Sequence, residues 1–514
     1  MKRSGENRIA ILIFLVLLGT ALSAEPDVYF RSNGGVPAGD RVPLPGDLSD
    51  GQTLVWKAGL PAGHSTPCVT ADRIFVSVFE KKLATVALDR KTGTRLWKRV
   101  VKIEGIEPTH SMGSPASSSP ASDGERVYVF FGSYGLVCYD LEGKLIWDKR
   151  MGPFQDDFGA SSSPVLAGDK VILNEDHDTG SFLIALDKLS GKTVWETPRS
   201  GHTRSYSTPV VWKSEGRETL LVAGALQLTA YDAQKGKRLW WINGLARIVN
   251  PTPVLGEDQL FVASWSPGGD TNSRISMEGW STANRRWDTD GNQILAGEEL
   301  PEGEVKGRLS IIDLDLDGGV NQVEWERYAR VFKLARNSIL AIRPGGQGDL
   351  TGTNVLWSYL RGVPYVTSPV LYRQVVYMVK NGGIVTSLDA ESGKLLKQGR
   401  LTGLGNYFAS PVAGDGKVYL ASESGVITVL KAGVEWEISS SHDLGERIMA
   451  SPVTADGRIY VRTEEALYSY GDPKVQITGT HGEPMMIPRS RSAGYGSGSS
   501  NGLDSRYALT DRPL

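Results

Sequence analysis

The sequence has few cysteines, almost no net charge and few long apolar runs. Only Cys68 and Cys138 occur in 514 residues, which excludes a scaffold built on several disulfides. Both fall in predicted strands of neighbouring repeats but at different strand positions. A bridge needs Cα atoms within about 7 Å, so we expect two buried thiols. Lysine plus arginine number 56 and aspartate plus glutamate 58, so no basic surplus favours nucleic acid or an anionic membrane as a partner.

The apolar run Ile9–Leu18 is shorter than the roughly 20 residues that a membrane-spanning helix needs. The basic residues Lys2 and Arg3 precede it, and the small residues of Ala21-Leu22-Ser23 follow it. This order is typical of a secretory signal peptide. We therefore predict a signal peptide at residues 1–23, export to the periplasm or beyond, and no transmembrane span after cleavage. An uncleaved membrane anchor is the competing interpretation.

What the sequence has in abundance is glycine, with 60 residues, and an internal repeat. Each repeat opens with a serine or threonine followed by proline. Successive prolines lie 41 to 53 residues apart, apart from one interval of 116 residues that contains an insertion of about 70. The eight openings are Thr66-Pro67, Ser119-Pro120, Ser163-Pro164, Thr208-Pro209, Thr252-Pro253, Ser368-Pro369, Ser410-Pro411 and Ser451-Pro452.

Each unit continues with the same series of short elements. An alternating strand such as Arg126–Phe130 is followed by a strand that ends in aspartate, and glycine follows three or four residues later. The aspartate can bond its own downstream backbone, and the glycine accepts the left-handed conformation of a hairpin turn. A last strand carries a tryptophan, which we expect to pack between neighbouring units. These tryptophans are Trp97, Trp147, Trp195 and Trp240. Lys397 replaces the tryptophan in the sixth unit, and in the seventh Trp436 comes one residue early.

Four short antiparallel strands in about 42 residues are typical of a β-propeller blade. We therefore predict an all-β protein, an eight-bladed β-propeller with four-stranded antiparallel blades, at residues 51–470. The last unit stops before its tryptophan strand, and the orphan segment Thr53–Lys57 precedes the first unit. We expect this segment to complete the last blade beside residues 466–470. The segment 472–514 has little apolar surface, which predicts a disordered tail.

The fifth unit contains an insertion, residues 273–335, which we interpret as a small α-helical EF-hand pair. Its second loop, Asp313–Glu324, fits the EF-hand pattern at six positions. Carboxylates stand at positions 1, 3, 5 and 12, a glycine at position 6 permits the sharp turn, and position 7 offers a backbone carbonyl. The predicted calcium ligands are Asp313, Asp315, Asp317, Gly319 and Glu324. An acidic surface turn is the alternative interpretation.

A weaker copy of the loop precedes it at residues 288–299. Gln293 stands where the pattern has glycine, which disfavours the required turn. The apolar residue at position 8 of each loop predicts a short strand contact between the two loops. The predicted ligands of this first loop are Asp288, Asp290, Asn292, Ile294 through its carbonyl, and Glu299.

The repeats resemble PQQ-like β-propeller repeats, as in quinoprotein dehydrogenases and in the propeller subunit of the outer-membrane protein assembly machinery. The resemblance rests on segments such as Ala116–Pro120, Asp123–Val129, Leu136–Asp140 and Phe158–Pro164. It is strongest to exported bacterial propellers of unassigned function. It does not imply bound PQQ, because the quinoprotein dehydrogenases carry adjacent cysteines and a funnel calcium. Here the two cysteines are far apart, the predicted calcium ligands lie in a side insertion, and no Cys-x-x-Cys-His haem motif occurs.

Polar residues in the connections that lead into innermost strands would gather at the funnel mouth, where loops on a rigid scaffold commonly bind ligands. Their spacing identifies no nucleophile–base pair, and polar residues that cap strand ends would give the same pattern. We therefore predict a non-enzymatic scaffold that binds an envelope protein, peptide or glycan. The alternative is an enzyme at the funnel mouth, either a quinoprotein-type dehydrogenase or a hydrolase or lyase. The polar residues predicted to lie at the funnel mouth are His64, His110, His202, His442, Asp156, Asp157, Arg204, Tyr206, Tyr365 and Tyr407.

Overall fold

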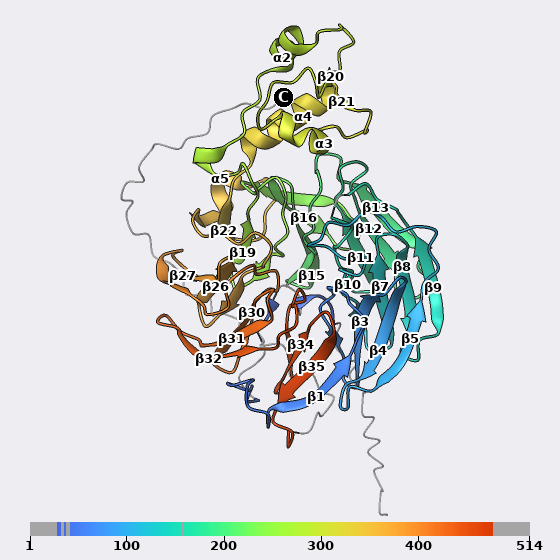
Figure 1. Ribbon diagram of the computed structural model, residues 1–514, viewed down its shortest axis with the longest axis vertical. Coiled ribbons are helices and arrows are strands. Elements are labelled where there is room, and N and C mark those ends of the chain that lie inside the picture. The colour runs from blue at the N-terminus through green and yellow to red at the C-terminus, as the bar shows by residue number, and fades with distance from the viewer. Residues whose placement is uncertain (1–27, 32–34, 38–41, 157, 476–514) are drawn as a thin grey trace, which may run out of the picture.

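The computed structural model describes residues 28–31, 35–37, 42–156 and 158–475. Eight sheets, each built on four antiparallel strands, stand around a central axis, and an inserted group of helices projects beyond the ring (Figure 1). The eight-bladed propeller predicted from the repeat is confirmed. The predicted signal peptide and nearly all of the predicted tail lie outside the described residues. Within the described part, no helix is both long and apolar enough to cross a membrane.

The first four blades follow one another along the chain, each running from the axis outwards. Blade one contains β2 (Cys68–Val69), β3 (Arg73–Phe79), β4 (Leu83–Asp89) and β5 (Arg95–Val100). Blade two contains β6 (Ala121–Ser122), β7 (Arg126–Phe131), β8 (Gly135–Asp140) and β9 (Leu145–Arg150). Blade three contains β10 (Val165–Ala167), β11 (Lys170–Glu175), β12 (Phe182–Asp187) and β13 (Thr193–Pro198). Blade four contains β14 (Val210–Ser214), β15 (Arg217–Gly224), β16 (Gln227–Asp232) and β17 (Arg238–Asn243).

The remaining blades repeat this order, with interruptions in blade five. Blade five contains β18 (Val254–Leu255), β19 (Leu260–Ser264), β22 (Ser338–Ile342) and β24 (Val355–Tyr359). Blade six contains β25 (Val370–Tyr372), β26 (Val375–Lys380), β27 (Ile384–Asp389) and β28 (Leu395–Arg400). Blade seven contains β29 (Val412–Gly414), β30 (Lys417–Ala421), β31 (Val426–Lys431) and β32 (Glu437–Asp443). Blade eight contains β33 (Val453–Ala455), β34 (Arg458–Arg462), β35 (Ala466–Gly471) and, from the other end of the chain, β1 (Leu54–Gly59).

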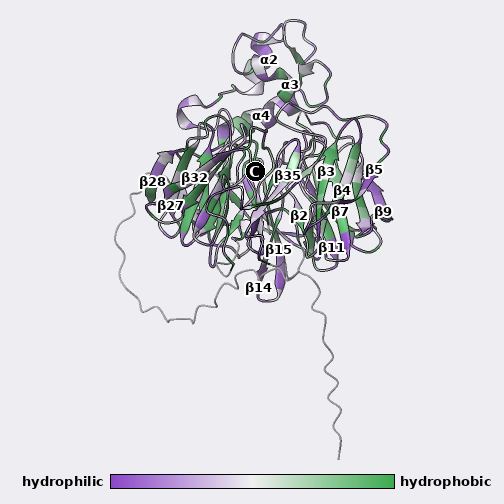
Figure 2. Ribbon diagram, turned by 60° about the horizontal axis from the view of Figure 1, so that its bottom comes forward, coloured by the Kyte–Doolittle hydropathy of each residue, from purple (hydrophilic) through white to green (hydrophobic). Residues whose placement is uncertain are grey.

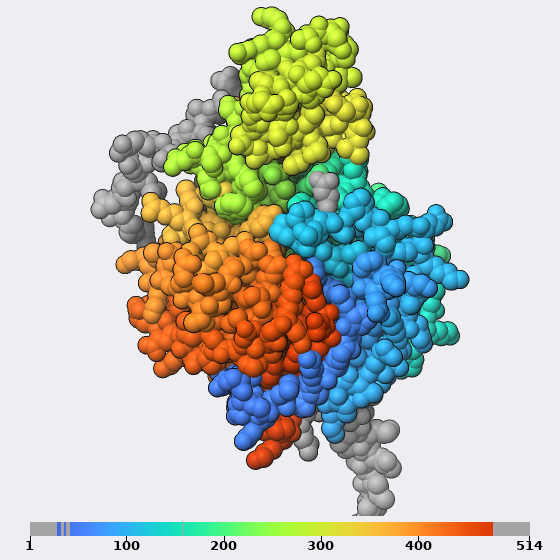
Figure 3. Space-filling view, in the orientation of Figure 1, coloured from blue at the N-terminus to red at the C-terminus, as the bar shows by residue number. Residues whose placement is uncertain are grey.

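Closure of the ring occurs where the sequence predicted it. Strand β1 pairs antiparallel with β35, with Trp56 opposite Ser469 and Lys57 opposite Tyr468. The blue and orange-red ends of the described chain therefore meet in one blade (Figure 3). This pairing covers the outer edge of β35 and holds the first and last blades together.

The serine and threonine that open each repeat link the innermost strands around the axis. In six of the blade pairs among the described residues, the backbone N–H of one opening residue donates to the hydroxyl oxygen of the next, at 2.9–3.1 Å. Thr66, for example, donates to Ser119, and Ser119 donates to Ser163. The hydroxyl thus satisfies a buried backbone donor of the neighbouring blade, which explains why the repeat opens with a hydroxyl-bearing residue.

The tryptophans join the outer parts of neighbouring blades, as predicted. The indole of Trp97 donates to the carbonyl of Leu141 in blade two, at 2.8 Å. Its ring lies over Gly143, where an added Cβ would stand 2.7 Å from the indole, and Gly143 has φ +81°. The glycine is needed both for its left-handed backbone and for the room that it leaves. The same contact recurs for Trp56, Trp147, Trp195 and Trp357.

Trp436 differs from the other tryptophans. It precedes β32, and its indole donates to Ser387 of blade six instead of the following blade. Lys397, which stands at the tryptophan position of blade six, places its ammonium 5.1 Å from the centre of the Trp436 ring. The early tryptophan therefore fills the space that the missing tryptophan of the preceding blade would leave.

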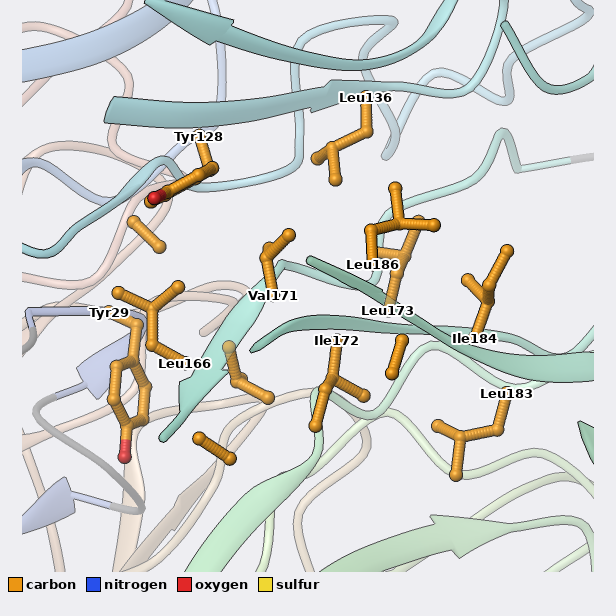
Figure 4. Close-up of a cluster of buried hydrophobic side chains, with 14 of the residues drawn as sticks. Tyr29, Tyr128, Leu136, Leu166, Val171, Ile172, Leu173, Leu183, Ile184 and Leu186 are labelled. Carbon is orange, nitrogen blue, oxygen red and sulfur yellow. The ribbon is translucent and has the colours of Figure 1, made fainter. Parts of the chain in front are cut away.

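The hydrophobic core is divided among the spaces between blades. One cluster, drawn in Figure 4, brings Tyr128 and Leu136 of blade two against Leu166, Ile172 and neighbouring residues of blade three. Figure 2 shows green, apolar residues concentrated in inner strands such as β3 and β4, with more purple at outer strands such as β9. Cys68 and Cys138 are buried and free, as the sequence predicted.

The insertion of blade five lies between β19 and β22. It contains a 3-10 turn (Thr271–Ser273), α2 (Trp280–Trp287), β20 (Leu295–Ala296), a 3-10 turn (Lys306–Arg308), α3 (Leu309–Ile312), β21 (Gly319–Val320) and α4 (Gln322–Leu334). Its helices enclose a core of their own around Trp325, Tyr328 and Phe332, and Leu226 of the propeller packs against that core.

A second interruption of blade five was not predicted from the sequence. Strand β23 (Gly348–Asp349) and the short helix α5 (Thr351–Asn354) separate β22 from β24. Strand β23 pairs parallel with β17, which makes blade four five-stranded. With no apolar periodicity in so short a segment, sequence patterns had nothing to indicate this pairing.

Candidate functional site

Two acidic loops face each other in the insertion. The first spans residues 288–299 and the second residues 313–324. Carboxylate oxygens of Asp288, Asp290 and Glu299 lie within 4.8 Å of one another, as do those of Asp313, Asp315 and Asp317. Strands β20 and β21 join the loops, with Leu295 opposite Val320, the apolar residues at position 8 of each loop.

The two loops share one hydrogen-bond pattern despite their different sequences. The aspartate at position 1 accepts the N–H of position 6, from Gln293 to Asp288 at 3.0 Å and from Gly318 to Asp313 at 3.0 Å. The residue at position 5 likewise accepts the N–H of position 7 in both loops. Position 6 is left-handed in both, with φ +64° at Gln293 and +95° at Gly318. The first loop therefore makes the turn even without its glycine, at the cost of a strained backbone.

The residues at position 12 close each loop. Glu324 is 4% exposed and accepts the N–H groups of Leu314 at 2.6 Å, Asp315 at 3.2 Å and Asn321 at 2.9 Å. Glu299 accepts the N–H groups of Thr289 and Ala296 in the first loop. Both carboxylates are thus held at the mouth of their loop by backbone donors.

The donor set fits a hard divalent cation. Asp313 is 7% exposed, and its Oδ1 has no hydrogen-bond partner among the described residues. A buried carboxylate oxygen without a donor is costly, and a cation bound between Asp313, Asp315 and Asp317 would satisfy it. Glu324 would complete the carboxylates, while Gly319 in the second loop and Ile294 in the first would offer backbone carbonyls. Asn292 adds an amide oxygen to the first loop.

The second candidate site is a cup on the propeller axis with a cavity volume of about 180 Å³. Its floor carries the hydroxyl ring of the repeat openings, and Phe158, Tyr206, Tyr365 and Phe408 contribute to its aromatic wall. Among the described residues that line the cup there is no aspartate, glutamate, lysine or arginine. His64 lines it as well, and burial lowers the pKa of its imidazole to about 4, which keeps it neutral.

Several polar residues predicted for the funnel mouth lie elsewhere. His442 is on β32, the outermost strand of blade seven, so its prediction as a residue leading into an inner strand was wrong. The extra length of that strand past its hairpin was not visible in the sequence. Tyr407 is buried and donates to the carbonyl of Gly403, a capping role. His110 packs beside Phe158 at the rim, with ring centroids 4.8 Å apart. Asp157 lies outside the described residues.

Asp156, His202 and Arg204 are buried below the rim. The guanidinium of Arg204 pairs with the carboxylate of Asp178. Burial lowers the pKa of His202 to about 4. A second buried pair lies nearby, with the guanidinium of Arg199 bonded to both carboxylate oxygens of Asp176 at 2.6 and 2.8 Å. These contacts fix the loops of blades three and four that reach the cup.

A buried acid–histidine cluster connects these loops to the cup. His177 Nε2 lies 2.9 Å from Glu175 Oε2, and His177 Nδ1 lies 3.6 Å from Asp156 Oδ2. The other oxygen of Asp156 accepts the hydroxyl of Tyr206, a cup residue, at 2.6 Å. Phe154 stacks on His177 with ring centroids 4.1 Å apart. Glu175 and His177 were missed from the sequence, because only the loop geometry reveals their proximity to Asp156.

Replacing His177 by asparagine should destabilise the protein more at pH 6 than at pH 9.5. Burial opposes the charge on His177, but hydrogen bonds to Asp156 and Glu175 outweigh it and raise its pKa to about 10. Because the pKa of His177 is higher in the folded than in the unfolded protein, where it is about 6.5, the charged imidazole stabilises the folded state. This stabilisation is complete below pH 6.5 and is lost as the pH rises towards 10. Urea unfolding at both pH values should show a difference of about 4 kcal/mol between the two losses. The variant His110→Asn, which replaces an exposed histidine, serves as the control. An equal loss of stability at both pH values for His177→Asn would contradict the prediction.

The protein is thus an eight-bladed β-propeller with PQQ-like repeats. It has a neutral axial cup and an inserted pair of acidic loops. The sequence model of one family, described as outer membrane protein assembly factor BamB, matches residues 46–152, 82–319 and 347–470. The chain belongs to this PQQ-like propeller family.

Known proteins share the fold at low sequence identity. The outer membrane protein assembly factor BamB of Yersinia pestis is 21% identical over 410 residues, 73% of this chain and 88% of that protein. The crystal structure of BamB from Moraxella catarrhalis superimposes with a TM-score of 0.52 at 15% identity, over 82% of this chain and 97% of that one. A quinohemoprotein alcohol dehydrogenase from Pseudomonas putida HK5 has a TM-score of 0.52 at 13% identity, over 89% and 80% of the two chains.

Proposed function

We propose that the protein is an exported, calcium-binding propeller that acts as a non-enzymatic binding or assembly scaffold in the cell envelope. The observation that carries the proposal is the family match across nearly the whole propeller, together with relatives whose names describe outer-membrane protein assembly. The basic and apolar N-terminal pattern supports export to the periplasm or beyond. The partner would be an envelope protein, peptide or glycan held at a propeller face.

Calcium binding by the two loops is part of this proposal. The ligands would be Asp313, Asp315, Asp317, Gly319 and Glu324 in the second loop and Asp288, Asp290, Asn292, Ile294 and Glu299 in the first. The buried oxygen of Asp313, which has no hydrogen-bond partner in the described part of the chain, and the shared hydrogen-bond pattern of the loops support it. Extracellular calcium sites can be as weak as about 10⁻⁴–10⁻³ M and still be filled where calcium is abundant.

The scaffold function is tested by affinity capture from a solubilised cell envelope of the native host. The tagged full chain is used as bait in 2 mM calcium chloride and, separately, in EGTA. A specific envelope protein or glycan recovered in stoichiometric amount and confirmed with the purified component would support the proposal. Recovery of no specific envelope component in either condition would contradict the proposal.

Calcium should protect residues 280–335 from proteolysis and leave the blades resistant in either condition. Without a cation the clustered carboxylates repel one another, whereas the ring of blades closes without the insertion. Limited trypsin digestion followed by mass spectrometry, with calcium or with EGTA, locates the cuts. A cleavage pattern that is the same in both conditions would contradict the prediction.

A quinoprotein-type dehydrogenase is the second candidate function, favoured by the likeness of the fold to the quinohemoprotein alcohol dehydrogenase. The cup argues against it, because the described residues of its lining include no arginine, lysine or acidic side chain that could hold the carboxylates of PQQ or a funnel calcium. We expect reconstitution with PQQ and calcium to give no turnover of alcohols or sugars in a dye-linked assay. Clear turnover would replace the scaffold by an enzyme.

A further inference from the structure

The insertion is attached to the propeller at both ends of the second acidic loop. At the start of the loop, the carbonyl of Leu314 accepts the side-chain amide of Gln155 at 2.7 Å. Just after the loop, Arg327 of α4 donates to the carbonyls of Ser200 at 2.9 Å and His202 at 3.4 Å. Leu314 follows Asp313, the first predicted ligand, and Arg327 lies one turn after Glu324, the last.

Both contacts reach the connections that build one side of the cup. Gln155 belongs to the connection between β9 and β10, which also supplies Phe158 to the cup wall. Ser200 and His202 belong to the connection between β13 and β14, which supplies Tyr206. The rings of Phe158 and Tyr206 meet edge-on, with centroids 5.9 Å apart. The insertion therefore holds the two adjacent connections that form this part of the wall.

The contacts continue inward from Gln155. Its neighbour Asp156 accepts the hydroxyl of Tyr206 and faces His177, and its other neighbour, Phe154, stacks on His177. Asp156 and His177 are 5% and 2% exposed, so this segment has little freedom to move independently of the cup wall. A displacement of Gln155 is thus passed to the position of Tyr206.

The second loop has a structural reason to shift when a cation binds. Both oxygens of Glu324 accept backbone N–H groups, of Leu314 and Asp315 at one end of the loop and of Asn321 at the start of α4. A cation that takes this carboxylate competes with those donors. The backbone at Leu314 and the first turn of α4 must then readjust, and these carry the two contacts to the propeller.

We propose that occupancy of the second loop by calcium is transmitted to the axial cup through Gln155 and Arg327, so that calcium orders the cup wall formed by Phe158 and Tyr206. This inference rests on the calcium binding proposed above and adds a regulatory link between two sites that are separate in sequence. The coupling is reciprocal, so a ligand that fixes the cup wall tightens calcium binding by the same factor.

Amide hydrogen–deuterium exchange of the full chain tests the link. Peptides covering residues 151–164 and 199–209 are compared in EGTA and in 2 mM calcium chloride, with calorimetry of calcium binding in parallel. In the wild type, calcium should slow exchange in both connections at least threefold. In the double variant Gln155→Ala, Arg327→Ala, calcium should still bind and the two connections should no longer respond. The variant Arg330→Ala, which removes an exposed side chain of α4 beyond the loop, should behave as the wild type.

The outcomes separate the two proposals. If calorimetry shows binding and neither connection responds in the wild type, the link is wrong and calcium binding stands. A response that persists unchanged in the double variant also overturns the link, since it would travel by another route. If the wild type binds no calcium at millimolar concentration, the calcium proposal fails and the link fails with it.

Discussion

Glu324→Gln should lower the calcium affinity of the second loop by about 100-fold, which corresponds to about 3 kcal/mol. In EF-hand loops the glutamate at position 12 binds calcium through both carboxylate oxygens, and glutamine offers a single neutral oxygen in its place. The carboxylate is buried and already directed to the loop by backbone donors from both of its ends. Calorimetric titration of the full chain with calcium measures the change.

The matched comparison is Glu299→Gln in the first loop. Glu299 belongs to a more exposed loop that turns at Gln293 instead of glycine, so we expect a smaller loss of affinity for the insertion as a whole. Glu302→Gln removes a carboxylate outside both loops and should leave the titration unchanged. An unaltered titration for Glu324→Gln, or a larger loss for Glu299→Gln, would contradict the predicted roles of the two loops.

Asp176→Ala should destabilise the protein by about 3–5 kcal/mol. Both oxygens of Asp176 bond the guanidinium of Arg199, and both side chains are fully buried. The substitution leaves Arg199 charged in the interior with the hydroxyl of Tyr231 as its remaining side-chain partner among the described residues. The midpoint of urea unfolding at pH 7 measures the loss.

Two further variants distinguish loss of charge pairing from loss of packing. The double variant Asp176→Leu, Arg199→Met removes both charges and should recover most of the lost stability. Glu218→Ala breaks an ion pair with Lys213, whose side chain is 66% exposed, and should cost less than about 1 kcal/mol. A cost for Asp176→Ala no larger than that of Glu218→Ala would contradict the role given to the buried pair.

The sequence predicted the ring because its strands are local and repeated. Each hairpin is specified within a few residues, such as Asp140 with Gly143, and Trp97 stands at a fixed distance from its own glycine. Eight repetitions of one pattern reinforce each other, and the orphan strand around Trp56 had one incomplete blade to join. Trp436 deviates from the pattern because its position depends on a space left by another blade.

The acidic loops were likewise visible in the sequence, since the predicted ligands of each loop fall within 12 consecutive residues. The left-handed turn at Gln293 was not expected, since glutamine by itself disfavours this conformation. The pairing of β20 with β21 and the backbone donors to Asp288 hold the turn in place. The surroundings of the loops were not predictable. Nothing in the sequence connects Gln155 with Leu314, which stand 159 residues apart.

The sequence by itself determined the number of blades, the closure of the ring, the place of the insertion and the residues of its acidic loops. The tertiary structure alone decided which residues meet at the axis, the proximity of Asp156, Glu175 and His177, and the docking of the insertion on the connections that form the cup. The physical reason is the range of the interactions. Turns, strands and acidic loops depend on neighbours along the chain, whereas a cup at the centre of a ring is assembled from loops of different blades, whose side chains approach one another only after the ring has closed.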